Sequence, residues 1–336
     1  MKFGPVPIEK AVGAILAHSK PVEGGVLKKG SVLTEQTCAA LAQTGAKTVT
    51  VARLEPGDVH ENDAALALAQ AIVQDPGVQG IRLSGAGTGR VNLYATRPGL
   101  LQITPDALEA ANRIDPMITV ATLPRWDRVE PGRMIATIKI IAYAVTAQIL
   151  SQVNQIAQDA LNIKSAVYGS ATLIETQTGP QRAPDKGRKA IATRLERLGV
   201  RLDPEIRVAH KTAPLAGALW DAKADVILIL TGSATSDPAD VAPAALRAAG
   251  GTVERFGMPV DPGNLLFLGN LKGKPVIGLP GCARSLALNG ADWVLERVLC
   301  GVPVSSDDIA GMAVGGLLKD SPNRPVPRRK IETDQT

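Results

Sequence analysis

Between residues 164 and 300, short apolar runs alternate with segments of helical periodicity. The run Val226–Leu230 precedes a helical pattern at 239–249, and Val276-Ile277 precedes another at 284–299. Strands that alternate with helices in this way are typical of a parallel sheet. The pattern therefore predicts an α/β domain with helices on both faces of a mainly parallel sheet. Its ligand is expected at the carboxyl ends of the strands. Further expected strands are 171–174 and 206–209, and further expected helices are 187–198 and 214–222.

Three loops follow predicted strands at the edge where a ligand would bind, and they span residues 176–187, 231–240 and 278–285. They supply glycines for close backbone approach, several hydroxyl groups, and the carboxylates of Asp185 and Asp240. Backbone N–H groups and hydroxyls suit a phosphate. A carboxylate can accept a hydrogen bond from a ring N–H or bind Mg²⁺. The loops therefore predict a phosphorylated, nitrogen-rich ligand.

Four motifs stand in the order found in the molybdopterin-binding domain shared by the MogA, MoaB, MoeA and CinA proteins. Thr231-Gly232, followed by Asp240-Val241 and Pro243, resembles that family's pattern T-G-G-T-G-x-x-x-x-D-V-T-P. The other three are Asp185-Lys186-Gly187, Pro262-Gly263-Asn264, and Gly278-Leu279-Pro280-Gly281 with Ser285. The resemblance covers residues 164–299. It implies a three-layer α/β/α fold that binds molybdopterin or its nucleotide form in the biosynthesis or delivery of the molybdenum cofactor.

The resemblance also implies which residues form the site. It gives Asp240 a catalytic role and a contact with Mg²⁺. The implied ligand contacts are Thr231, Gly232, Ser233, Thr235, Asp185, Gly263, Asn264, Gly278, Pro280, Gly281, Cys282 and Ser285. As an enzyme, the chain would perform Mg²⁺-dependent adenylyl transfer with ATP and AMP as nucleotides, or molybdate insertion with loss of AMP. The alternatives are a non-catalytic pterin carrier or sensor and a CinA-like pyrophosphatase that binds nucleotides.

Several positions depart from the family pattern. Ser233 replaces a glycine, and Asn264 replaces the lysine of MoeA-like proteins, which removes a charge that could neutralise a phosphate or molybdate. Cys282 and Ala283 replace the usual Asn-Pro. Capping explains other positions without a ligand: Asp185, Asp240 and Ser285 each precede a predicted helix. Gly278 and Gly281 could form a tight turn only, and Cys282 could be an inert thiol.

The rest of the chain is predicted to form smaller units. Residues 1–86 are expected to be a small α+β domain, with a helix at 34–43, a strand at 48–51 and a helix at 61–73. Residues 87–146 are expected to be β-rich, 147–163 to be a connecting helix, and 301–336 to be a linker-like tail. Residues 1–146 loosely resemble the N-terminal part of a MoeA-like bacterial group. Lys139 lies within an apolar run and is expected to point either into a pocket or to solvent.

Composition limits the remaining possibilities. Three scattered cysteines and three scattered histidines offer no metal-ligand spacing and no disulfide framework, which fits a reducing cytoplasm. No apolar run has membrane-spanning length, and the N-terminus lacks the apolar block of a signal peptide. Aromatic residues make up only 3%, so stacking on nucleic acid is not expected. The resemblance implies a homo-oligomer. It further implies a molybdenum cofactor cytidylyltransferase or a molybdoenzyme as partner.

Overall fold

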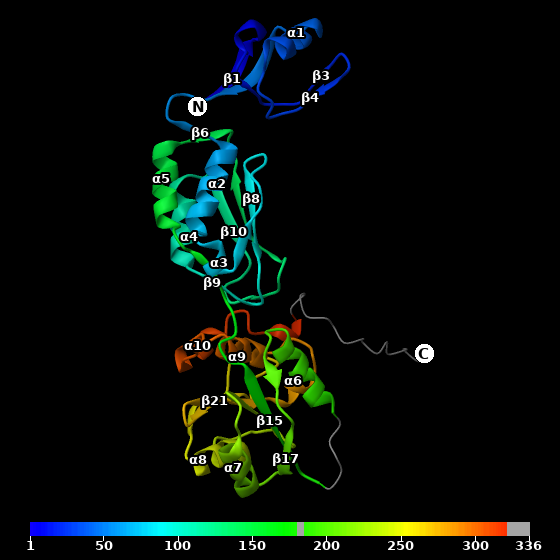
Figure 1. The fold of residues 1–336 in the computed structure, drawn as a ribbon, viewed down its shortest axis with the longest axis vertical. Helices are drawn as coiled ribbons and strands as arrows, with labels where there is room; N and C mark the ends of the chain where they lie inside the picture. Colours follow the sequence, from blue (N-terminus) through cyan, green and yellow to red (C-terminus); the bar gives the residue numbers. More distant parts are fainter. Residues whose placement is uncertain (180–184, 321–336) are drawn as a thin grey trace, which may run out of the picture. The chain divides into compact units, whose positions relative to one another are not determined.

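The computed structural model describes residues 1–179 and 185–320 (Figure 1). The chain divides into two compact units. The first comprises residues 1–97 and 101–163, and the second comprises residues 98–100 and the chain from Lys164 onward. Each unit is described by itself.

The first unit begins with a small lobe, residues 1–53, built on a three-stranded antiparallel sheet. Helix α1 (Glu35–Gln43) confirms the expected helix, and it is capped by Thr34, whose side chain forms a capping box with Thr37. Leu16, Leu41 and Val51 belong to the buried cluster of the lobe. Its other elements are β1 (Lys2–Pro7), the 3₁₀ turn Ile8–Lys10, β2 (Ile15–Leu16), β3 (Lys20–Val22), β4 (Gly25–Leu27) and β5 (Thr48–Arg53).

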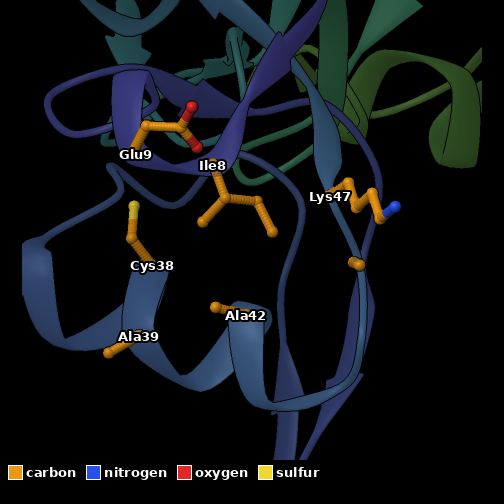
Figure 2. A pocket seen from close by; sticks show the side chains of 7 residues that line it. Ile8, Glu9, Cys38, Ala39, Ala42 and Lys47 are labelled. Atoms are coloured by element: carbon orange, nitrogen blue, oxygen red, sulfur yellow. The ribbon is translucent and has the colours of Figure 1, made fainter.

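A shallow pocket of about 440 Å³ lies beside helix α1 of this lobe (Figure 2). Figure 2 shows Cys38 and Ala42 on the helix opposite Ile8, with Glu9 and Lys47 as the charged lining residues. Burial raises the pKa of the Cys38 thiol, which keeps it protonated at neutral pH. The thiol is therefore a poor nucleophile.

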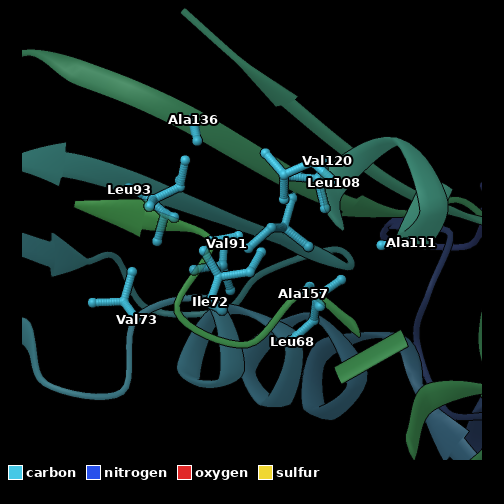
Figure 3. Packing of buried hydrophobic residues seen from close by; sticks show 14 of the residues in the cluster. Leu68, Ile72, Val73, Val91, Leu93, Leu108, Ala111, Val120, Ala136 and Ala157 are labelled. Carbon is cyan, nitrogen blue, oxygen red and sulfur yellow. The ribbon is translucent and has the colours of Figure 1, made fainter. Parts of the chain in front are cut away.

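The remainder of the first unit packs helices against β-strands around an apolar core (Figure 3). Leu68 and Ile72 from α2 meet Val91 and Leu93 from β8 in this core. The helices are α2 (Glu61–Ile72), α3 (Pro76–Gln79), α4 (Pro105–Ile114) and α5 (Ala147–Ile156). The strands are β6 (Asp58–His60), β7 (Ile81–Leu83), β8 (Arg90–Ala95), β9 (Gly99–Ile103), β10 (Ile118–Thr122), β11 (Arg128–Val129), β12 (Met134–Ile140), β13 (Ala144–Thr146) and β14 (Leu161–Lys164).

This core crosses the domain boundaries expected from the sequence. The expected division at residues 86 and 87 separates α2 from β8, yet both contribute to one buried cluster. Helix α5, expected only as a connection, adds Leu150 and Val153 to the same cluster. Neither α2 nor the sheet could bury its apolar face alone, so the two segments share a core. Lys139 lies within the same unit, where it contacts Glu61 Oε2 at 3.5 Å and donates to the Thr88 carbonyl.

The second unit is an α/β domain built on a seven-stranded mixed sheet of described residues. The strands β16, β17, β15, β18 and β21 are parallel, as the alternation of elements predicts. Strands β20 and β19 extend this sheet antiparallel beyond β21. The strands are β15 (Ser170–Gln177), β16 (Arg201–Leu202), β17 (Ile206–Ala209), β18 (Val226–Leu230), β19 (Thr252–Phe256), β20 (Phe267–Leu271) and β21 (Lys274–Leu279).

Helices cover both faces of this sheet. Ile227 and Ile229 of β18 share one buried cluster with α7 (Thr212–Asp221) and α8 (Val241–Ala248). Alternate strand residues point to the opposite face, where Gly187 of α6 (Lys186–Glu196) lies against Leu230. Helix α9 (Gly290–Leu299) joins α6 on that face through a buried ion pair between Arg194 and Asp292. The expected three layers are therefore present.

Two expectations about the end of this unit are wrong. The helix expected at 284–299 starts only at Gly290, because Asn289 and Asp292 form a capping box there. A 3₁₀ turn, Gly281–Arg284, stands before it, so Ser285 does not cap α9. The tail after Gly301 is not all linker, since α10 (Ser306–Gly311) and the 3₁₀ turn Leu318–Asp320 follow. Their residues Ile309 and Leu318 are buried and anchor this segment. The rest of the expected tail, 321–336, lies outside the described residues.

Candidate functional site

Thr176 joins the carboxyl ends of three parallel strands, β15, β17 and β18. Its hydroxyl accepts the backbone N–H of Gly232 at 2.9 Å and forms a hydrogen bond with Nδ1 of His210 at 2.8 Å. The fit is close, because a Cβ at Gly232 would lie 2.7 Å from the Thr176 carbonyl oxygen. The Thr231 loop is therefore held directly against the end of β15.

Arg284 connects the turn after β21 to the same edge. Its Nη2 donates to the Thr231 carbonyl at 3.0 Å, and its Nη1 donates to Glu175 Oε1 at 3.2 Å. The Glu175 side chain is only 1% exposed, whereas that of Arg284 is 30% exposed. One guanidinium thus links the ends of β15, β18 and β21 while part of it faces solvent.

A second carboxyl group, that of Glu205, forms a hydrogen bond with Glu175. Burial and this hydrogen bond raise the pKa of Glu175 to about 7. Burial acts in the same direction on Glu205, but hydrogen bonds from Glu175 and Arg207 outweigh it and lower the pKa of that carboxyl. The two carboxyls therefore take up a proton as the pH falls through about 7, and this proton belongs to the pair.

Arg207 stands on the other side of this pair. Its Nη2 lies 3.7 Å from Glu175 Oε2 and 2.9 Å from Asp185 Oδ1, and its Nε lies 2.8 Å from Glu205 Oε2. Asp185 makes no capping hydrogen bond to α6. The carboxylate expected to touch the ligand or to cap the helix is therefore engaged by Arg207.

Arg194 of helix α6 shapes the segment that follows the turn at 281–284. This buried guanidinium donates to the carbonyls of Ala283 at 2.9 Å and Ser285 at 2.6 Å and forms a short ion pair with Asp292. Buried carbonyls need such donors when no regular secondary structure supplies them. A single side chain thus replaces the helical hydrogen bonds that the sequence pattern predicts here.

The geometry of these loops agrees with a comparison against protein families. Residues 166–299 match the family described as "Probable molybdopterin binding domain". This part of the chain is therefore similar to that family over most of the second unit. Residues 5–53 match a "Domain of unknown function (DUF8806)". A search of curated proteins finds no match to this chain.

Two solved structures of a molybdopterin biosynthesis MoeA protein from Pyrococcus horikoshii are also similar to the whole chain. The first is 14% identical, with 90% of this chain and 75% of that chain covered at a TM-score of 0.32. The second is 10% identical, with 91% and 76% covered at a TM-score of 0.24. These TM-scores are too low to support the fold, so the assignment rests on the family match and on the loops themselves.

In the second unit, Asp240 caps helix α8. Its Oδ1 accepts the backbone N–H of Val241 at 2.7 Å, and its Oδ2 accepts that of Ser236 at 3.1 Å. Thr231 and Thr235 contact each other through their hydroxyls at 3.3 Å, and Ser233 is exposed between them. Within residues 1–179 and 185–320, no group of three or more His, Cys, Asp or Glu side chains is placed to hold a metal ion. Any Mg²⁺ here would depend on Asp240 together with ligand phosphate and water, the usual coordination of this ion.

The residues expected in the last loop differ in their surroundings. Gly278 lies inside β21, where a Cβ would come within 1.9 Å of the Phe267 ring, so packing alone requires this glycine. Gly281 is exposed, and a Cβ there would meet nothing within 4 Å. Pro280 is buried and accepts the backbone N–H of Ala283. Cys282 and Ser285 are half-buried. Gly281 is therefore the position of this loop that a ligand can approach closely.

The turn at 262–264 reaches helix α9. Gly263 packs so closely on the start of the helix that a Cβ would lie 2.7 Å from the backbone nitrogen of Gly290. The carbonyl of Pro262 accepts that same N–H at 2.8 Å. Asn264 is exposed and uncharged. Residues 262–264 therefore add no cation to the second unit.

The sequence patterns missed Glu175, Arg207 and Arg284, and they gave His210 no role. Glu175 directly follows the expected strand at 171–174, and a carboxylate next to such a buried run is a signal that could have been followed. Arg284 stands three residues after Gly281, inside the segment expected to be helical. The helical expectation placed its side chain on a helix face instead of across the strand ends.

Proposed function

We propose that the second unit binds molybdopterin, or its nucleotide form, at the carboxyl edge of its sheet, as part of molybdenum cofactor biosynthesis or delivery. The supporting observation is the convergence of the loops after β15, β18 and β21, joined by Thr176 and Arg284, within a domain of the molybdopterin-binding family. The phosphate of the pterin would approach Gly281 and the N–H groups of the 3₁₀ turn. Hydroxyls of the Thr231 loop would contact polar atoms of the ligand.

A carrier or sensor is favoured over an enzyme by two observations. Both carboxylate oxygens of Asp240 already accept backbone N–H groups, which is the geometry of a helix cap. Asn264 leaves the turn at 262–264 without the lysine that could neutralise transferred phosphate or molybdate. Phosphoryl chemistry depends on such charge neutralisation. We therefore favour a protein that binds the pterin without catalysing adenylyl transfer or molybdate insertion.

The test is a calorimetric titration with molybdopterin of the wild-type chain and of two glycine variants. Gly281→Ala adds a methyl group to open space, so the fold is expected to persist while the ligand loses its close approach to the loop. The matched control is Gly217→Ala, another exposed glycine with nothing within 4 Å of its would-be Cβ, in helix α7. Weaker binding in the first variant only is the expected result. A wild-type chain that does not bind molybdopterin would refute the proposal.

Turnover separates the catalytic alternatives. The bound complex is incubated with ATP and Mg²⁺, or with molybdate, and AMP is measured. AMP transfer or release that is lost in Asp240→Asn would establish an enzyme and overturn the carrier function. Hydrolysis of a nucleotide without pterin binding would establish the pyrophosphatase alternative. A homo-oligomer and a cytidylyltransferase or molybdoenzyme partner stay predictions from the resemblance.

A further inference from the structure

We propose that Arg284 is the cation that meets the anionic group of the ligand, and that the Glu175–Glu205 pair holds it in place while leaving its charge available. This inference rests on the proposed function, because it names the residue that recognises the anion at the same site. The argument combines the chemistry of the loops, the contacts of Arg284 and the charge of the pair behind it.

Two described stretches of the loops that would surround an anion carry no charged side chain, and Asp237 and Asp240, farther along the 231–240 loop, are acidic. Residues 231–235 and 280–283 have only hydroxyl, thiol and apolar side chains, and Asn264 is neutral. Backbone N–H groups can hold a phosphate without a cation. A guanidinium adds charge-assisted hydrogen bonds in the fork geometry that matches phosphate oxygens. Arg284 ends the 281–284 turn and is therefore the cation built into this loop.

Arg284 differs from the two neighbouring arginines in how its guanidinium is engaged. Arg194 is 6% exposed and donates to several carbonyls and to Asp292. Arg207 is 17% exposed and contacts three carboxyl groups. Arg284 is 30% exposed, and its contacts to Glu175 and to the Thr231 carbonyl use two of the five N–H groups of a guanidinium. Its solvent-facing side can therefore accept a ligand without breaking the contacts that position it.

The charge balance around Glu175 keeps Arg284 electropositive. Arg284 contacts Glu175 from the turn after β21. Arg207, in β17, and Glu205, directly before β17, lie on the other side of Glu175. Asp185 and Arg188 stand nearby at the start of α6. One oxygen of each carboxyl, Oε2 of Glu175 and Oε1 of Glu205, is buried and has no hydrogen-bond donor among the described residues. Two such carboxyls side by side share a proton, because both cannot ionise without cost. The pair then carries one negative charge, which Arg207 contacts directly.

An anion bound to Arg284 would change the pKa of the neighbouring Glu175 carboxyl. The anion offsets the positive charge that favours ionised Glu175, so the pKa of this carboxyl rises further from about 7 when the ligand binds. Binding then takes up a fraction of a proton. The affinity for the ligand is therefore highest below the pKa of Glu175 in the free protein, and it declines as the pH rises through the pKa of Glu175 in the complex. By linkage, each unit of additional shift corresponds to about a tenfold change in affinity.

The experiment titrates the full chain with molybdopterin by calorimetry at about pH 6, 7 and 8, in two buffers of different ionisation enthalpy. The variants are Arg284→Gln, Arg284→Lys and Glu175→Gln. The control is Arg201→Gln, which removes an arginine 69% exposed at the opposite end of β15. Thermal unfolding of each variant reports whether the fold persists. The ionisation of the ligand phosphate affects all proteins equally, so the comparison with Glu175→Gln isolates the contribution of the carboxyl.

We expect Arg284→Gln to weaken binding by about tenfold or more, the scale of a charge-assisted hydrogen bond. Arg284→Lys should recover part of the affinity, and Arg201→Gln should bind like the wild type. The wild type should lose affinity relative to Glu175→Gln from about pH 7 to 8, and it should take up more protons on binding than Glu175→Gln does. Unchanged affinity in Arg284→Gln would overturn the role of Arg284. Identical pH profiles and proton uptake in the wild type and Glu175→Gln would overturn the role of the pair. A wild type that binds no molybdopterin at any pH would overturn the proposed function itself.

Discussion

Replacing Asp292 by alanine would leave a buried arginine without its counterion. The Asp292 side chain is 8% exposed and that of Arg194 is 6% exposed. Asp292 Oδ1 accepts from Arg194 Nε in a short hydrogen bond, and its Oδ2 accepts the backbone N–H of Asn289 at 2.8 Å. One substitution therefore removes both a buried ion pair and one half of the capping box of helix α9.

The expected cost follows from these two losses. Removal of one partner from a buried ion pair typically destabilises a protein by about 3–5 kcal/mol, because an uncompensated charge stays buried. Loss of a helix cap adds about 1 kcal/mol. A domain is commonly stable by about 5–15 kcal/mol. Asp292→Ala should therefore remove a large share of the stability of the second unit. Arg194 should also lose its hold on the carbonyls of Ala283 and Ser285.

The assay is native-state hydrogen exchange in increasing urea, read on peptides from α6 and α9 and compared with peptides from α2 and α5 in the first unit. Exchange should accelerate strongly in the second unit and stay unchanged in the first. Glu109→Ala removes an exposed ion pair with Arg113 and serves as the control, with no measurable change expected. A loss below about 1 kcal/mol in Asp292→Ala would refute the reasoning, because Arg194 would then not depend on its partner.

Further outcomes follow from single positions. Gly217→Ala should stabilise helix α7 by about 0.5–1 kcal/mol, since the Cβ meets open space in a helix interior. Gly232→Ala should destabilise the protein by about 1–3 kcal/mol, since the added Cβ would lie 2.7 Å from the Thr176 carbonyl oxygen. The urea midpoint of unfolding measures the effect of each glycine variant, and a midpoint equal to that of the wild type would contradict the prediction. The pKa of Glu175 is raised from 4.5 to about 7. The protonated carboxyl therefore contributes its full stabilisation below about pH 4.5, and this stabilisation is lost as the pH rises through about 7. Glu175→Gln should therefore gain stability relative to the wild type between about pH 5 and 8, and a constant difference in urea midpoint across that range would contradict this.

Local patterns were sufficient for much of the second unit. The five apolar residues Val226–Leu230 form a fully buried strand, as a continuous β-branched and leucine run predicts for a parallel sheet. Asp240 caps α8 as its position before Val241 predicts. Thr34 caps α1 for the same reason. These features depend on residues adjacent in the chain, so a single sequence contains the information.

Expectations failed where distant residues decide the outcome. The segment 285–289 has helical periodicity but is not helical, because Arg194 satisfies its carbonyls and Asn289 offers a stronger start for α9. Sequence spacing also gave no sign that Gly278 packs against the Phe267 ring of a neighbouring strand, and its ligand contact stays a prediction. The boundary expected after residue 86 divides a core that both sides need. In each case the deciding contact joins segments far apart in sequence.

The sequence by itself determined the α/β class of the second unit, four of its parallel strands with the helices between them, and the loops that end at the carboxyl edge, but not the strands β16, β19 and β20. Periodicity and capping are local properties, and they suffice for that. Only the tertiary structure decided which charges meet at this edge. The chain brings together Glu175, Glu205, Arg207 and Arg284 from separate elements, and burial of the carboxyls then changes their pKa values. Burial and charge pairing depend on the packed neighbours of a side chain, and no spacing along the chain specifies them.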